Sequence, residues 1–299
     1  MRIGLTAYDV PAAELVALAR AADEAGFDSL WLGEHVLLPI ADRTAHPTTQ
    51  QGHVQHHTGP IVQPDTELVD PLVVLGAAAA TTTHLRVATG IYVLPLRHPL
   101  AVARSTCTLQ EIAGGRFIFG VGVGWLTGEF EALGVPFDER VGRFLDAIAV
   151  LRAAWAGGEV RHDGQYFAVR GVQVTARPTE VPVILGGNTP RALRRAAQLG
   201  DGWFSSGTPP LDEAVRLRDE LLRLRRQADH EVGGERPFHL VVRVEGRDPS
   251  VLARYDEAGF ADVAIWADHV WPPDLAPAAR RDHLFAAAAA LGLHRQAAA

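Results

Sequence analysis

The feature that most constrains this 299-residue chain is a repeated alternation of short apolar segments with segments of helical periodicity. Eight apolar segments are expected to be strands, at residues 3–8, 28–33, 85–93, 116–121, 182–185, 202–205, 238–244 and 263–266. Helical patterns cover residues 11–25, 70–82, 99–112, 138–155, 190–199, 211–227, 249–258 and 276–291. Strict alternation implies parallel strands. Eight such units without a change of composition predict one domain over residues 1–299, a single (β/α)8 TIM barrel with insertions.

A long polar segment interrupts this alternation after the second strand. Residues 41–67 contain many Gly, Pro, Thr, Gln and His residues, and we expect them to form a lid or insertion loop. Four histidines lie within it, namely His46, His53, His56 and His57. Their spacing could suit a metal, but no cysteine or acidic residue lies between them. We therefore expect solvated imidazoles and no metal site. A second insertion, a small hairpin, is expected at residues 165–172.

Composition and charge exclude several classes of protein. The net charge of −7 argues against a nucleic-acid binder, which would usually carry a basic patch. No apolar run reaches the length of a membrane span. The single cysteine excludes an internal disulfide, and the chain contains no lysine, so all 28 basic residues are arginines. Because the first residues read directly as a strand and not as a leader, we expect a cytoplasmic protein.

Candidate catalytic residues follow the second predicted strand. In a barrel of this kind the chemistry takes place where the strands end. Glu34 and His35 stand at such an end, and a carboxylate beside an imidazole can fix or charge it for proton transfer near neutral pH. Arg97 follows the third strand and either pairs with an anionic substrate or cofactor tail or lies in a surface turn.

Two glycine-rich turns follow the fourth and fifth strands. The segment "GVGVGW" places Trp125 where a dinucleotide-binding fingerprint needs glycine. It favours a loop that approaches a flat ligand closely, with Trp125 as a wall; the alternative is a tight strand exit. In "GGNTPRA", Asn188 or Thr189 can cap a helix that begins at Pro190. The free N–H groups of this turn could bind a phosphate, or the turn could be only a helix start.

Three stretches of the chain, residues 21–39, 69–148 and 181–203, resemble the bacterial luciferase-like superfamily. The motifs that carry the resemblance are "WLGEHVLLP", "ATGIYVLPLRHP", "GVGVGWLTGEFEALG" and "VILGGNTPRAL". The resemblance is strongest to the actinobacterial branch of oxidoreductases that use coenzyme F420, an 8-hydroxy-5-deazaflavin. It implies a barrel, usually a homodimer, and a non-prolyl cis peptide bulge at Gly90–Ile91 under the central ring of the cofactor.

The resemblance also implies a set of cofactor-binding residues. The ring would contact Thr89, Gly90 and Ile91, and the loop Gly122, Val123, Gly124 and Trp125 would contact the cofactor too. The phosphate and its tail would lie near Gly186, Gly187, Asn188 and Thr189.

The function implied is hydride transfer between F420 and an organic substrate, with His35 handling the proton and Glu34 orienting His35. In members that oxidise sugar phosphates, a glutamate follows the Gly-x-Gly loop, and lysines bind the phosphate. Trp125 takes the place of that glutamate and the chain has no lysine, so an apolar or aromatic substrate is expected. Two alternatives stay open. One is an FMN-dependent monooxygenase supplied by a partner reductase, and the other is a non-catalytic flavin- or F420-binding barrel.

Overall fold

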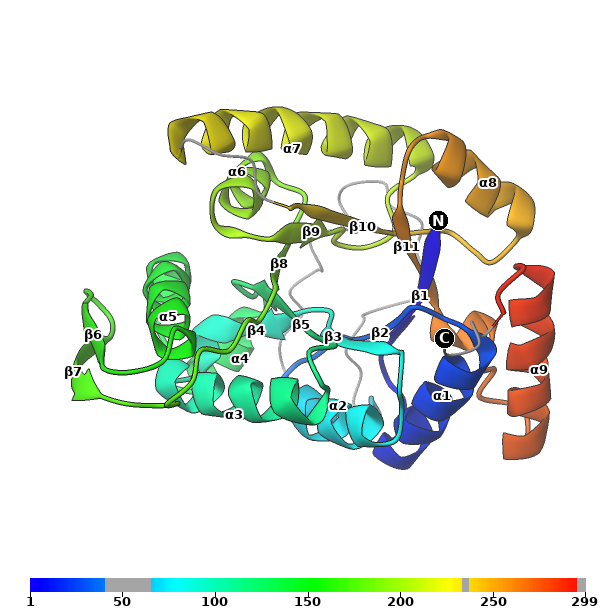
Figure 1. Cartoon of the computed structure of the whole chain (residues 1–299), viewed down its shortest axis with the longest axis horizontal. Helices are drawn as coiled ribbons and strands as arrows, with labels where there is room; N and C mark the ends of the chain where they lie inside the picture. Colours follow the sequence, from blue (N-terminus) through cyan, green and yellow to red (C-terminus); the bar gives the residue numbers. More distant parts are fainter. Residues whose placement is uncertain (41–65, 233–236, 295–299) are drawn as a thin grey trace.

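The computed structural model, which describes residues 1–40, 66–232 and 237–294, has a closed barrel of eight parallel strands at its centre (Figure 1). The strands, in order around the barrel, are β1 (Arg2–Ala7), β2 (Ser29–Leu32), β3 (Arg86–Thr89), β5 (Phe117–Gly122), β8 (Val183–Gly186), β9 (Gly202–Phe204), β10 (His239–Arg243) and β11 (Asp262–Trp266). Pairing of β1 with β11 closes the barrel. The predicted TIM barrel is therefore confirmed.

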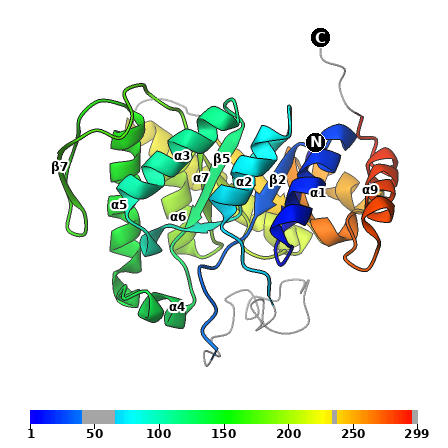
Figure 2. The ribbon, with the colours of Figure 1, turned by 90° about the horizontal axis from the view of Figure 1, so that it is seen from below.

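Helices surround the strands on all sides (Figures 1 and 2). They are α1 (Ala12–Ala25), α2 (Pro71–Ala80), α3 (Pro99–Ile112), α5 (Arg140–Trp155), α6 (Pro190–Leu199), α7 (Leu211–Val232), α8 (Pro249–Glu257) and α9 (Pro277–Ala290). Short 3-10 turns cover Leu94–Leu96, Phe137–Glu139 and Ala267–His269. Most bounds lie within two residues of the predicted ones, although α7 continues to Val232. None of the described helices is long and apolar enough to cross a bilayer.

Some elements differ from the sequence predictions. The short helix α4 (Thr127–Ala132), which lies between β5 and α5, was not predicted. The third predicted strand is divided into β3 and the two-residue β4 (Tyr92–Val93). The hairpin of β6 (Val160–Asp163) and β7 (Ala168–Val172) begins earlier than expected. The predicted lid at 41–67, with its four histidines, lies outside the described residues except for its last two positions.

The barrel interior is filled by one apolar layer. Its members are Trp31, Ala88, Ile118, Ile184, Phe204, Val241 and Ala264, and Ile91 packs against them. The Trp31 and Phe204 rings stack with their centroids 4.8 Å apart. Because successive residues of a strand face opposite sides, residues two positions beyond these members also face the barrel axis. Such positions at the carboxyl ends of the strands form the mouth of the barrel.

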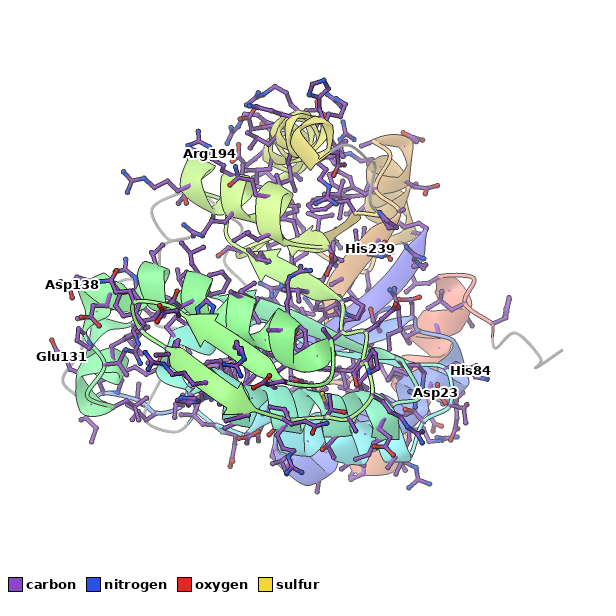
Figure 3. All side chains as sticks on the ribbon, turned by 60° about the vertical axis from the view of Figure 1, so that its left-hand side comes forward. Asp23, His84, Glu131, Asp138, Arg194 and His239 are labelled. Atoms are coloured by element: carbon purple, nitrogen blue, oxygen red, sulfur yellow. The ribbon has the colours of Figure 1, made fainter. Side chains whose placement is uncertain are left out.

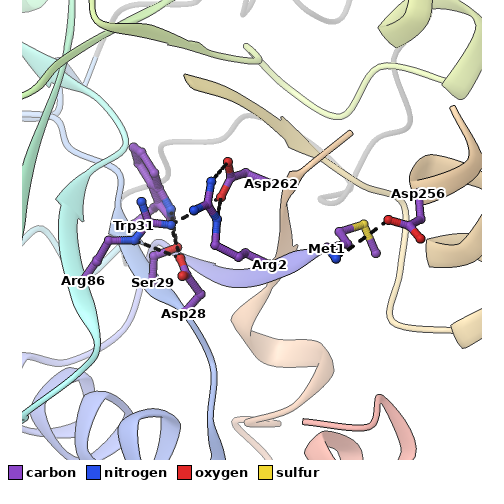
Figure 4. Close-up of polar contacts among 8 residues, drawn as sticks. All are labelled: Met1, Arg2, Asp28, Ser29, Trp31, Arg86, Asp256 and Asp262. Carbon is purple, nitrogen blue, oxygen red and sulfur yellow. Dashed lines mark hydrogen bonds and ion pairs between the residues drawn. The ribbon is translucent and has the colours of Figure 1, made fainter. Parts of the chain in front are cut away.

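Ion pairs close the opposite end of the barrel (Figure 4). The Arg2 guanidinium donates to both carboxylate oxygens of Asp262 at 2.6 Å. Arg86 bonds Asp262 at 3.3 Å and also bonds Asp28. Nearby, the buried Asp23 carboxylate accepts hydrogen bonds from the backbone N–H groups of residues 83–85, and it lies beside His84 in Figure 3. These charges are matched, as expected of the end of a TIM barrel that serves stability.

Close contact between β3 and β5 requires glycine at position 120. A Cβ atom there would lie 1.9 Å from the backbone oxygen of Thr89. We expect Gly120→Ala to lower the free energy of unfolding by about 3 kcal/mol, because the strands would have to separate. Denaturant unfolding measures this change. Gly246→Ala is the control, since a Cβ at Gly246 meets nothing within 4 Å. Equal stability of the two variants would contradict the expectation.

Candidate active site

His35 lies just beyond β2, at the mouth of the barrel, and its ring is held from three sides. Its Nδ1 is 3.1 Å from Oε2 of Glu129, a residue of α4 with a fully buried side chain. The His35 ring meets Trp125 edge-on at a centroid distance of 5.5 Å and Tyr8 at 6.5 Å. His35 is itself 7% exposed. The imidazole is therefore fixed in orientation by a carboxylate and two aromatic rings.

Glu129 reaches His35 because α4 folds back toward the exit of β2. Its Oε1 accepts a hydrogen bond from the backbone N–H of Val36, while Oε2 faces His35. The sequence analysis missed this residue because a six-residue helix gives almost no periodic signal. One signal was present: the spacing of Leu126, Glu129 and Phe130 puts a carboxylate on the same helix face as two apolar residues.

The predicted pairing of Glu34 with His35 is wrong. The Glu34 carboxylate accepts hydrogen bonds at 2.6 and 2.8 Å from the two terminal nitrogens of Arg97, and one at 2.6 Å from the N–H of Val93. Burial raises the pKa of Glu34 above its ordinary value, although the charge and hydrogen bonds of Arg97 oppose this rise. A two-pronged arginine pair with a third donor satisfies the buried carboxylate. Glu34 is therefore a positioning residue that ties β2 to β4.

Arg97 is fully engaged in this arrangement. Beyond its bonds to Glu34, its guanidinium stacks over the Tyr92 ring at 4.2 Å. Both interpretations left open for Arg97 are therefore corrected. Its anionic partner is the Glu34 side chain and not a substrate or cofactor tail, and it does not lie in an exposed surface turn, since its side chain is 21% exposed.

The peptide bond between Gly90 and Ile91 is cis, as the resemblance implied. The bulge turns the Ile91 side chain toward the next strands around the mouth. A Cβ at Gly122 would lie 2.2 Å from Cδ1 of Ile91, and one at Gly186 would lie 2.5 Å from the same atom. The two glycines therefore leave the space that Ile91 occupies. Thr89, just before the bulge, donates to the carbonyl of Gly120 at 2.7 Å.

We call Ile91, with Gly122 and Gly186 beside its side chain, the Ile91 platform. The loop after β5 connects this platform to His35. Gly124 has a φ of +80°, and a Cβ there would lie 2.7 Å from side-chain atoms of Phe130 and Val93. Only glycine suits this position. The loop contains half-buried Val123 and then Trp125, whose ring meets the His35 ring edge-on. The structure thus brings the predicted loop and His35 together.

The turn after β8 is built as a helix start. Gly187 has a φ of +113°, and its carbonyl accepts from the Trp203 indole at 2.9 Å. Asn188 exchanges two hydrogen bonds with the backbone of Ser206, both at 2.9 Å. Thr189 is the residue that caps α6, with its hydroxyl accepting from the N–H of Ala192. Of the two possible caps, Thr189 is therefore the one used.

Three arginines gather beside this turn, and the sequence analysis did not group them. Burial lowers the pKa of Arg195, and the nearby charges of Arg140 and Arg191 lower it further. Arg140 stacks on the Phe137 ring at 3.7 Å, and its buried Nε has no hydrogen-bond partner among the residues described. Arg191 sits in the first turn of α6, where a helix repels cations. We call Arg140, Arg191 and Arg195 the arginine cluster. The positive charge of this cluster favours the binding of an anion.

Within the described residues, no group of three or more His, Cys, Asp or Glu side chains could hold a metal ion.

A barrel whose mouth combines a carboxylate-held histidine with a glycine-lined platform has the layout of a TIM-barrel enzyme. The sequence pattern of the luciferase-like monooxygenase family matches residues 2–245, and this chain belongs to that family. It is an oxidoreductase of the luciferase-like class.

Similar proteins support this assignment. An uncharacterized protein of Mycobacterium tuberculosis (strain ATCC 25618 / H37Rv) is 30% identical over 252 residues, which cover 84% of this chain and 83% of the relative. The F420-dependent glucose-6-phosphate dehydrogenase of Beutenbergia cavernae is 34% identical over 199 residues, covering 64% of this chain and 52% of the relative. A solved F420-dependent secondary alcohol dehydrogenase has the same fold, with a TM-score of 0.71, 18% identity, and coverage of 97% of this chain and 98% of that one.

Proposed function

We propose that this protein transfers a hydride between coenzyme F420 and a small organic substrate. The observation that carries the proposal is the arginine cluster beside the turn at Gly186–Thr189. F420 extends beyond its phosphate into a lactyl and polyglutamyl tail, whereas FMN ends at its phosphate. One helix start satisfies a phosphate. Three further cations, of which Arg195 lies near the charges of the other two, suit the additional carboxylates of F420. Relatives with F420-dependent activity support the same cofactor.

The described residues fit the deazaflavin as well as its tail. Ile91, packed against Gly122 and Gly186, offers an apolar surface on which a flat ring can lie. Thr89, Gly90, Val123, Gly124 and Trp125 would border the ring. Gly187, Asn188 and Thr189 would hold the phosphate through the start of α6. When bound, the deazaflavin supplies hydride chemistry that amino-acid side chains lack.

In the proposed reaction the protein itself transfers the proton, through His35. The Glu129 carboxylate at Nδ1 selects the tautomer that carries its proton there, which leaves the Nε2 lone pair to accept a proton. An alcohol would lose its proton to Nε2, and a carbonyl would regain one from the same atom. Half-buried Tyr8 and Trp125 cover two sides of the imidazole and limit the access of water to it.

Several further properties belong to this proposal. We infer one domain over residues 1–299, residues 41–67 as a lid, a cytoplasmic location and a homodimer. Val73 on α2 and Ile112 on α3 are 72% and 47% exposed, and these neighbouring helices suit an interface. Trp125 and the lack of lysine support an apolar or aromatic substrate body.

Fluorescence titration with F420 and with FMN tests the choice of cofactor. We expect F420 to bind at least about ten-fold more tightly than FMN, because the arginine cluster contacts its tail. The double variant Arg191→Ala/Arg195→Ala should weaken F420 binding by about ten-fold and change FMN binding by less than about two-fold. Arg223→Ala, which removes an exposed cation from α7, is the control.

The same titrations separate the alternatives. Micromolar FMN binding without F420 binding would overturn the proposal in favour of a monooxygenase fed by a reductase. Tight F420 binding without turnover of any alcohol or ketone in a broad panel would favour a non-catalytic binding protein.

A further inference from the structure

Arg243 stands at the mouth of the barrel and forms no ion pair with any residue that the structure describes. It ends β10, two residues after Val241 of the apolar layer, so its side chain faces the barrel axis. Its guanidinium lies 4.9 Å from the centroid of the Phe204 ring and 4.6 Å from that of Trp266. One terminal nitrogen reaches the Thr6 hydroxyl at 3.4 Å, and the buried Nε has no hydrogen-bond partner within the described ranges of the chain. The residue is only 8% exposed.

The other buried arginines among the described residues have carboxylate and carbonyl partners of a kind that Arg243 lacks. Arg225 pairs with Asp229 and bonds the carbonyls of two residues that flank the end of α6. Arg280 pairs with Glu14 and likewise bonds backbone carbonyls. Arg243 has neither a carboxylate nor a carbonyl partner in the described part of the chain. A buried cation without an anion is costly, so such a site is retained where a ligand completes it.

Burial lowers the pKa of Arg243 to about 10, which keeps the guanidinium charged at neutral pH. Within the described residues, the guanidinium contacts one hydrogen-bonding side chain, the Thr6 hydroxyl. Ser205 already accepts from the Arg243 N–H at 2.8 Å and bonds the Gly207 carbonyl. A phosphate needs more donors than this, whereas a carboxylate matches one guanidinium fork. Phe204 and Trp266 provide aromatic walls beside it.

We propose that Arg243 binds a carboxylate group of the substrate, whose apolar or aromatic body lies in the mouth between β10 and the Ile91 platform. The two strands are opposite each other, since β10 is four strands from β3 in either direction around the barrel. The proposal rests on the proposed function, because it assumes a substrate held over the Ile91 platform. It narrows the substrate from apolar compounds in general to apolar monocarboxylates.

Benzoate and its neutral counterpart benzamide test this inference by calorimetric titration of the F420-loaded protein. We expect benzoate to bind at least about ten-fold more tightly than benzamide. Arg243→Met should remove that preference and change F420 affinity by less than about three-fold, and Arg243→Lys should keep part of it because it retains the charge. Arg170→Met, at an exposed position of β7, is the control.

Thermal unfolding without ligand gives an independent measurement. Arg243→Met should unfold at the wild-type temperature or above it, because the variant loses an unpaired buried charge. A markedly lower temperature for both Arg243 variants would indicate a structural role and overturn the inference. Equal binding of benzoate and benzamide, no binding of either, or a loss of F420 affinity in Arg243→Met with benzoate binding intact would also overturn it.

The titrations with F420 and with benzoate distinguish a failure of this inference from a failure of the proposed function. If F420 does not bind, but the ligand-free or FMN-loaded protein prefers benzoate through Arg243, the cofactor proposal fails and the carboxylate site stands. If F420 binds and benzoate is not preferred over benzamide, the cofactor proposal stands and the carboxylate site fails.

Discussion

Replacing His35 by alanine should reduce turnover by about 100-fold or more while F420 affinity changes by less than about three-fold. General acid–base groups contribute about 10²–10⁴-fold to rates, and the contacts proposed for the cofactor lie on other residues. The measurement is the rate of F420 reduction or oxidation with a panel of alcohols and ketones, together with a fluorescence titration of F420. Glu129 holds the imidazole, so Glu129→Gln should reduce the rate by a smaller factor.

His84→Ala is the matched control, because His84 is exposed and lies far from the mouth (Figure 3). Its turnover should equal that of the wild type. Unchanged turnover in His35→Ala would remove His35 from the mechanism. A parallel loss of turnover and of F420 affinity would instead mean that His35 shapes the cofactor site.

Replacing Arg97 by alanine should lower the free energy of unfolding by about 3–5 kcal/mol. The variant leaves the Glu34 carboxylate, whose side chain is 1% exposed, buried without its counter-charge. The bond of Glu34 to the Val93 N–H compensates only in part. Urea unfolding followed by circular dichroism measures the change.

The control for this variant is Arg216→Ala, which breaks an exposed pair with Glu213 on α7. That pair should contribute less than about 1 kcal/mol. Arg97→Ala with the stability of Arg216→Ala would show that the buried pair contributes nothing to the fold. A loss of turnover at full stability would instead return Glu34 and Arg97 to the reaction.

The barrel could be predicted because its signals are local. Each strand of a parallel barrel is buried on both faces and reads as an apolar run, and each helix carries its own period and caps. Thr189 before Pro190 is such a cap. The bulge at Gly90–Ile91, in contrast, was placed by resemblance to a family and not by any pattern of apolar residues.

The partners within the site could not be predicted, because they depend on contacts between distant segments. Glu34 and His35 are neighbours in sequence, but their side chains point to Arg97 and to Glu129, which are 63 and 94 residues away. No single-sequence pattern distinguishes these partners. Arg243 was missed for a related reason: its meaning lies in the absence of a partner, which only the fold reveals.

The backbone link between the exit of β2 and the bulge has a consequence for how this enzyme can diversify. The N–H of Gly90 donates to the carbonyl of Leu32 at 2.6 Å. The bulge is therefore hydrogen-bonded directly to the end of β2, the strand that precedes His35. The separation of the two backbones is therefore set by the spacing of paired strands, about 4.8 Å. Mutations that spare Glu129, Trp125 and Tyr8, which hold the His35 ring, can change which molecule is accepted while the imidazole and the Ile91 platform keep their relative positions.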